Sequence, residues 1–211
     1  MDNIKLEISE KYLDYVLTHN KQPESVYAFC KEIGISEKEF YDQYSSFQQI
    51  SERIWTAIFQ QTTTNIEAED IYQSYSVREK MLALYYSLLE NLKNKRSFVL
   101  FSLKKYPINW LAESDVLVGT EENFKNFVQN LIREGIDSKE VADRPFLTER
   151  YQKFLWLQFV FILNYWQKDT SQSFERTDAA VEKAVNLGLD LIGTNVADSA
   201  FDFVRFYFGK N

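Results

Sequence analysis

The feature that most constrains the fold of this chain is the stretch 25–44, in which two short segments with helical spacing flank a glycine. In the first segment Val26, Phe29 and Cys30 occupy positions i, i+3 and i+4, which lie on one face of a helix. Gly34 follows where this helix must end, because glycine adopts the left-handed conformation of a helix C-cap at little steric cost. The spacing therefore predicts a short helix that stops at a tight turn.

The second segment begins with the signature of a capping box. Ser36 is followed three residues later by Glu39, so that each side chain can bond the backbone N–H of the other residue. Phe40 and Tyr44 then give the second helix an apolar face. A helix, a glycine-centred turn and a second helix together form a helix-turn-helix.

The same residues resemble a known family. Ser25-Val26, Cys30-Lys31-x-x-Gly34-Ile35-Ser36 and Phe40-Tyr41-x-x-Tyr44 resemble the N-terminal motif of tetracycline-repressor (TetR) type regulators, approximately S-V-x-x-I-A-x-x-A-G-V-S-x-G-T-L-Y-x-H-F, without a gap. The resemblance implies an all-α, TetR-like fold, with a three-helix helix-turn-helix module over 1–48 and a helical ligand-binding and dimerisation domain over 49–211. It places the DNA-binding positions at Ser36, Lys38, Glu39, Tyr41 and Gln43.

The charges of the presumed reading helix are unfavourable for a polyanion. Affinity for duplex DNA comes largely from Lys and Arg side chains that neutralise phosphates. Glu37, Glu39 and Asp42 outnumber Lys38, and residues 1–55 carry six Lys and Arg against ten Asp and Glu. Glutamate can accept a hydrogen bond from cytosine, but here the basic rim of a DNA-binding surface is missing. We therefore expect DNA binding that is weak or lost, with Glu39 serving as the capping residue.

Composition narrows the remaining function classes. The chain has 211 residues, 45% of them hydrophobic, with a net charge of −7, one Cys and one His. A single Cys excludes an internal disulfide, and one His with one Cys leaves neither a metal site nor a Cys-His pair. We expect a cytoplasmic protein that is not an enzyme, with no metal, no cofactor and no integral membrane segment.

Apolar periodicity predicts helices along the whole chain. They cover residues 4–18, 47–68, 77–94, 98–105, 120–134, 154–166, 174–192 and 196–208, and Gly135 is expected to cap the helix 120–134.

The helix 154–166 and its successor predict a dimer. The sequence FLWLQFVFILNYW is apolar on nearly every side, so one side can face the protein's own core and the other requires a partner. The next helix carries a seam of small residues that permits close approach of another helix, at Ala180, Ala184 and Gly188. TetR-like proteins pair through their last two long helices, and we expect an isologous homodimer.

Aromatic residues suggest a cavity for an apolar small molecule or lipid. The candidate ligand-binding residues are Tyr85, Phe98, Phe101, Trp110, Phe127, Trp156 and Phe159. The alternative is that the same side chains form a solid core.

The loop after Trp166 carries a second resemblance. Trp166-x-x-Asp169-x-Ser171-x-x-Phe174-Glu175-x-Thr177 is similar to a motif of the mitochondrial ubiquinone-biosynthesis accessory protein family, which has a TetR-like fold, lacks DNA binding and binds lipids and isoprenoids. The structural alternative is that Ser173 caps the next helix while Asp169 and Thr177 bond loop amides.

Two functions therefore remain open. The first is a TetR-family-like dimeric transcriptional regulator that senses a small apolar ligand and binds DNA weakly or atypically. The second is a TetR-fold lipid- or isoprenoid-binding accessory protein that has lost DNA binding. The acidic reading helix favours the second, and the resemblance along the whole architecture favours the first.

Overall fold

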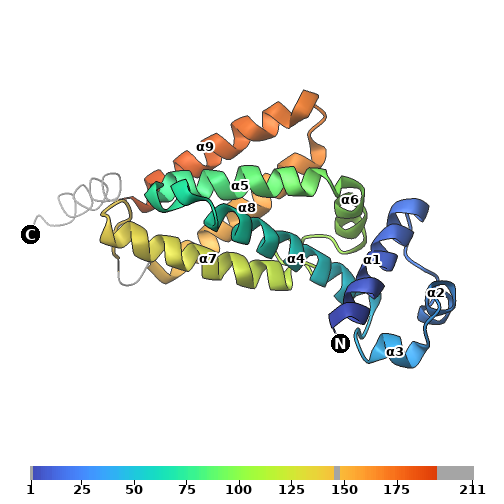
Figure 1. Ribbon diagram of the computed structural model, residues 1–211. Helices are drawn as coiled ribbons and strands as arrows, with labels where there is room; N and C mark the ends of the chain where they lie inside the picture. Colours follow the sequence, from blue (N-terminus) through green and yellow to red (C-terminus); the bar gives the residue numbers. More distant parts are fainter. Residues whose placement is uncertain (1, 145–147, 194–211) are drawn as a thin grey trace, which may run out of the picture. The chain divides into compact units, whose positions relative to one another are not determined.

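The structure is a computed structural model that describes residues 2–144 and 148–193 (Figure 1). Within these ranges the chain forms nine α-helices and no strand, so the all-α prediction is confirmed. Contacts divide it into two compact units, Met1–Gln61 with Leu89–Asn123 and Thr62–Leu88 with Phe124–Asn211. The predicted module boundary near residue 48 stays a prediction. None of the described helices is long and apolar enough to cross a membrane.

The first unit is built around the N-terminal helices. It contains α1 (Asp2–His19), α2 (Val26–Ile33), α3 (Glu37–Tyr41), the first part of α4 (Phe47–Glu67) and α6 (Arg96–Lys105). Helix α2 packs on α3, and α1 packs on α6 (Figure 1).

An aromatic cluster holds α1, α2, α3 and α4 together. The ring of Phe29 on α2 meets the rings of Tyr12, Phe40 and Phe47 edge-on, at centroid distances of 6.2, 6.3 and 5.4 Å. Such edge-to-face pairs add stabilisation beyond the area they bury. Phe29 is therefore the central residue of this small core.

The second unit contains the longer C-terminal helices. Its elements are η1 (Asp70–Ser74), most of α5 (Val77–Lys93) and α7 (Val118–Asp137), α8 (Thr148–Lys168), η2 (Gln172–Phe174) and α9 (Glu175–Ile192). Helices α8 and α9 make the most extensive contact between elements. The helix predicted over 196–208 lies outside the described residues.

Gly135 corrects one sequence-based prediction, because it lies inside α7 and does not end it. A Cβ atom at this position would lie 2.5 Å from Cγ2 of Val141 and 3.1 Å from Cγ2 of Val77. Glycine is thus required by the close approach of neighbouring side chains, and the helix continues to Asp137. The start of α8 also differs, since this helix begins at Thr148, six residues before the predicted residue 154.

Asp169 organises the loop between α8 and α9. Its Oδ2 accepts hydrogen bonds from the backbone N and the Oγ1 of Thr177 at 2.9 and 2.6 Å. Its Oδ1 accepts from the N and Oγ of Ser171 at 2.8 and 2.7 Å. These bonds, led by that from the Thr177 hydroxyl, hold the pKa of Asp169 well below its usual range. Of the structural alternative for this loop, the part concerning Asp169 agrees with the structure, since Asp169 accepts from the backbone N of Ser171 and of Thr177. Ser173 does not cap α9, because it adopts a left-handed φ of 51° and Asp169 bonds the first turn instead.

Replacement of Phe29 tests the aromatic cluster. We expect Phe29→Ala to lower the free energy of unfolding by about 3–5 kcal/mol, because it empties the centre of a packed core. Tyr27→Ala is the matched control, since Tyr27 lies on the same helix with 63% of its surface exposed. Urea unfolding followed by circular dichroism measures both variants. Equal losses for the two variants would contradict the assignment of Phe29 as the centre.

Asp169→Asn tests the loop through its pH dependence. A carboxylate whose pKa is lowered by folding stabilises the fold above the unfolded aspartate pKa of about 3.9, and this contribution is lost as the pH falls toward the folded-state value. We therefore expect the variant to be less stable than wild type at pH 7, with a difference that shrinks steadily below about pH 4.

Urea unfolding at a series of pH values measures that difference. Glu182→Gln, which removes an exposed carboxylate of α9, should change stability little at every pH. A deficit for Asp169→Asn that is as large in acid as at neutral pH would show that the four hydrogen bonds do not carry the effect.

Candidate functional site

The helix-turn-helix of the first unit is built as the sequence predicts. The Ser25 side chain accepts a hydrogen bond from the N of Ala28 and starts α2, and Gly34 ends this helix with φ 80° and ψ 27°. Ser36 and Glu39 form the reciprocal capping box: the N of Glu39 donates to Oγ of Ser36 at 3.2 Å, and the N of Ser36 donates to Oε2 of Glu39 at 2.8 Å. The capping-box and glycine-turn predictions are confirmed.

The structure brings the five candidate DNA-binding residues together on α3 and its flanks. Ser36 and Glu39 bond each other, and the hydrogen bonds from the N and the hydroxyl of Ser36 lower the pKa of Glu39. Tyr41 is exposed over 55% of its surface, while Gln43 is half-buried just beyond the helix. The side chains of this surface that are not engaged in the cap are thus Lys38, Tyr41 and Gln43.

The positive charge of Lys38 is offset by a neighbouring carboxylate. Its Nζ lies 2.8 Å from Oδ2 of Asp42 one turn along, and this hydrogen bond raises the pKa of Lys38. The pair is exposed and contributes little stability, but it offsets the one cation of α3. With Glu37 and Glu39 also exposed, the outer surface of α3 is acidic.

The seven aromatic candidates for a ligand site fall in two places. Tyr85, Phe127, Trp156 and Phe159 belong to the second unit, whereas Phe98, Phe101 and Trp110 belong to the first. Trp110 lies between α6 and α7 with 89% of its surface exposed, so it does not join an interior cluster. Phe98 is buried and Phe101 is half-buried.

The rings of the second unit pack against one another. The centre of the Phe159 ring lies 4.8 Å from that of Trp156, on which it stacks, 6.3 Å from that of Tyr85 and 5.1 Å from that of Phe124, which is not among the seven candidates. Burial raises the pKa of Tyr85, whose hydroxyl donates to Oε1 of Gln158 at 3.2 Å. Ligand binding at these residues stays a prediction.

A groove of about 750 Å³ runs between α8 and α9. Phe161 and Leu187 line it with 52% and 61% of their surfaces exposed. The three residues of the predicted dimer seam also line it, with Ala180 and Ala184 half-exposed and Gly188 buried. Gly188 leaves room for Gln158, whose Nε2 would lie 2.2 Å from a Cβ at that position.

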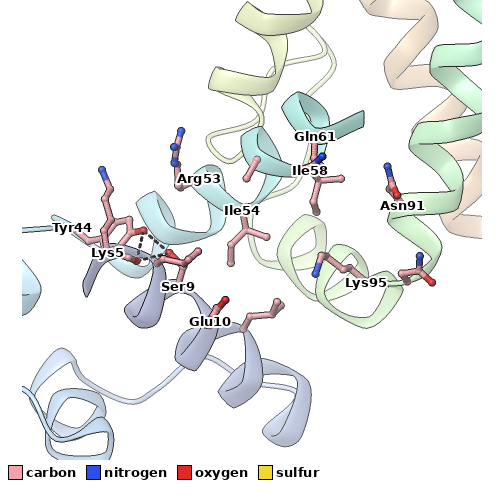
Figure 2. A pocket seen from close by; sticks show the side chains of 14 residues that line it. Lys5, Ser9, Glu10, Tyr44, Arg53, Ile54, Ile58, Gln61, Asn91 and Lys95 are labelled. Carbon is pink, nitrogen blue, oxygen red and sulfur yellow. Dashed lines mark hydrogen bonds between the residues drawn. The ribbon is translucent and has the colours of Figure 1, made fainter. Parts of the chain in front are cut away.

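A second pocket, of about 650 Å³, lies in the first unit, where no sequence motif predicts one (Figure 2). We call it the α1–α4 pocket. Its lining comprises Lys5, Leu6, Ser9, Glu10, Leu13, Tyr44, Arg53, Ile54, Ala57, Ile58, Gln61, Asn91, Asn94 and Lys95. These residues come from four segments that are up to 90 positions apart, so no local motif marks them. In the described part of the chain, no group of three or more His, Cys, Asp or Glu could hold a metal ion.

Comparisons with known proteins agree with this architecture. A family model described as "Tetracyclin repressor-like, C-terminal domain" matches residues 80–207. A solved structure of a putative tetR family transcription regulator from Shewanella sp. PV-4 superposes with a TM-score of 0.61 at 16% identity, over 91% of this chain and 99% of that chain. At this identity the second likeness shows the fold alone. No curated protein matches the chain. Because the family model spans more than half of the sequence, the chain belongs to the tetracycline repressor-like (TetR) family.

Proposed function

We propose that this protein is a dimeric transcriptional regulator that contacts duplex DNA weakly through α3 and responds to a small apolar ligand. The observation that carries the proposal is the intact helix-turn-helix of α2 and α3, with its glycine turn and capping box, in a chain of the TetR family. Tyr41, with 55% of its surface exposed at the end of α3, is available for contact with DNA.

The electrostatics of α3 support weak and atypical binding. Each phosphate contact by Lys or Arg releases counterions, which gives affinity and its dependence on salt. Here Lys38 is paired with Asp42, and Glu37 and Glu39 repel phosphates. Contacts of Tyr41 and Gln43 with the bases would therefore supply affinity without a strong contribution from contacts with the DNA phosphates.

Salt-dependent DNA binding tests the proposal. The full chain is titrated into a pool of random-sequence duplexes, and binding is followed by fluorescence anisotropy between about 50 and 200 mM salt. We expect weak binding at the lower salt concentration that falls as salt is added. Glu37→Lys should tighten this binding several-fold and steepen the salt slope by about 1, because it adds one phosphate contact.

Glu122→Lys is the control, since it makes the same charge change at an exposed position of α7. Equal tightening by both variants would indicate an effect of net charge and would argue against α3 as the reading helix. Absence of binding by the wild-type chain at about 50 mM salt would contradict the regulator.

The groove between α8 and α9 supports the proposed homodimer. A monomer with Phe161, Leu187 and Leu191 exposed leaves apolar surface in water along two neighbouring helices. Ala180 and Ala184 lie in the same groove and allow a partner helix to approach closely. An isologous pairing would place the same groove of two chains against each other.

Phe161→Glu tests this interface. Burying a carboxylate in an interface removes its hydration at a large cost in free energy, so we expect the variant to elute as a monomer where the wild type is a dimer. Size-exclusion chromatography with light scattering measures the mass. Leu17→Glu, at an exposed position of α1, should leave the mass of the wild type unchanged. A dimeric Phe161→Glu variant, or a monomeric wild type, would rule out this groove as the interface.

The second candidate function is a lipid- or isoprenoid-binding accessory protein that has lost DNA binding. The acidic surface of α3 favours it. The residues around Asp169 resemble that family, whereas the hydrogen bonds that Asp169 accepts from the N of Ser171 and of Thr177 are those of the structural alternative. The salt titration separates the two candidates, because only the regulator binds duplex DNA at low ionic strength.

A further inference from the structure

The α1–α4 pocket is positively charged in an acidic protein. Lys5, Arg53 and Lys95 line it against a single acid, Glu10, although the net charge of the whole chain is −7. Among the described residues, none of these three cations forms an ion pair with a carboxylate. A concave surface lined by charges of one sign concentrates ions of the opposite sign. The pocket is therefore suited to an anion.

The floor of the same pocket is apolar. Ile54 and Ile58 lie one turn apart on α4 and are almost completely buried, and Ala57 lies between them in the sequence. Leu6 and Leu13 of α1 add to the apolar lining. A DNA phosphate has no apolar surface to pack against this floor, whereas a ligand with an apolar body gains free energy by covering it.

One wall of the pocket is fixed by hydrogen bonds. The Tyr44 hydroxyl donates to the backbone O of Lys5 at 3.0 Å and also bonds Oγ of Ser9, and Nζ of Lys5 lies 5.5 Å from the centre of the Tyr44 ring (Figure 2). This wall exists before any ligand arrives, which reduces the entropy lost on binding.

We propose that the α1–α4 pocket binds a small anionic amphiphile, a carboxylate joined to a hydrocarbon body. The planar guanidinium of Arg53 suits a carboxylate, because it can donate two parallel hydrogen bonds, and Lys95 adds a second positive charge. The volume of about 650 Å³ falls within the range of roughly 300–1,000 Å³ that small-molecule sites occupy.

Binding of an amphiphile in this pocket does not depend on the proposed function. A regulatory effect of that binding does rest on the proposed function. Tyr44 follows α3 by three residues, and Lys5 and Ser9 belong to α1. A ligand in this pocket would therefore contact the chain immediately beside the reading helix.

Isothermal titration calorimetry of the full chain, without DNA, tests the proposal. The probes are decanoate and decan-1-ol, which share a tail and differ in charge. We expect decanoate to bind at least tenfold more tightly than the alcohol. The double variant Arg53→Gln with Lys95→Gln should lose at least tenfold in decanoate affinity, and Ala57→Phe, which fills the floor, should weaken both probes.

Lys104→Gln is the matched control, because Lys104 is an exposed cation of the same unit outside the pocket. Unchanged thermal unfolding midpoints verify that the variants fold. Failure of decanoate to bind, equal affinity for the alcohol, or equal losses with Lys104→Gln would each overturn the proposal. Because no DNA is present, the result for decanoate does not depend on whether the chain binds DNA. Failure of the pocket proposal and failure of the proposed regulator function can therefore be told apart.

Discussion

The turn between α2 and α3 is the constraint on which the helix-turn-helix depends. Helix α3 has five residues, far fewer than a helix needs to persist alone in water. It is held at its start by the reciprocal bonds of Ser36 and Glu39, and along its length by Phe40, which is fully buried against Phe29. The carboxylate of Glu39 is thereby occupied by its hydrogen bond from the backbone N of Ser36. Its negative charge in a presumed reading helix has a structural cause that does not depend on which bases are read.

The distribution of charge separates two kinds of anion. On α3, the cation Lys38 is offset by Asp42 and followed by no exposed Lys or Arg before Arg53. In the α1–α4 pocket, by contrast, three cations face one acid above an apolar floor. An extended polyanion needs a continuous basic surface, whereas a small amphiphile needs only a local positive site beside hydrocarbon. The first unit therefore offers more to a small anion than to DNA.

The parts of this structure that depend on neighbouring residues could be predicted from the sequence. The parts that depend on contacts between distant residues could not. Gly34 and the Ser36–Glu39 box could be recognised because their geometry is set within four residues. Gly135 looked like a helix end but proved to be a contact point for Val141 and Val77, which no local pattern reveals. The α1–α4 pocket was missed for the same reason, since its cations are separated by up to 90 positions. Trp110 shows the converse: aromatic character alone does not predict burial.

Helix α8 shows how one polar residue organises an apolar helix. The sequence predicts a helix that is buried on two sides, in which Gln158 is a polar residue among apolar ones. In the structure its Oε1 accepts a hydrogen bond from Tyr85 and its Nε2 donates to the backbone O of Ala184 at 2.6 Å. This bridge fixes α9 against the inner face of α8, and the missing side chain of Gly188 makes room for it. The outer face of α8, with Leu157, Phe161 and Tyr165, is exposed in the part of the chain that the structure describes. These three residues are 38–52% exposed, so their apolar surfaces would gain free energy if the second copy of the proposed dimer covered them.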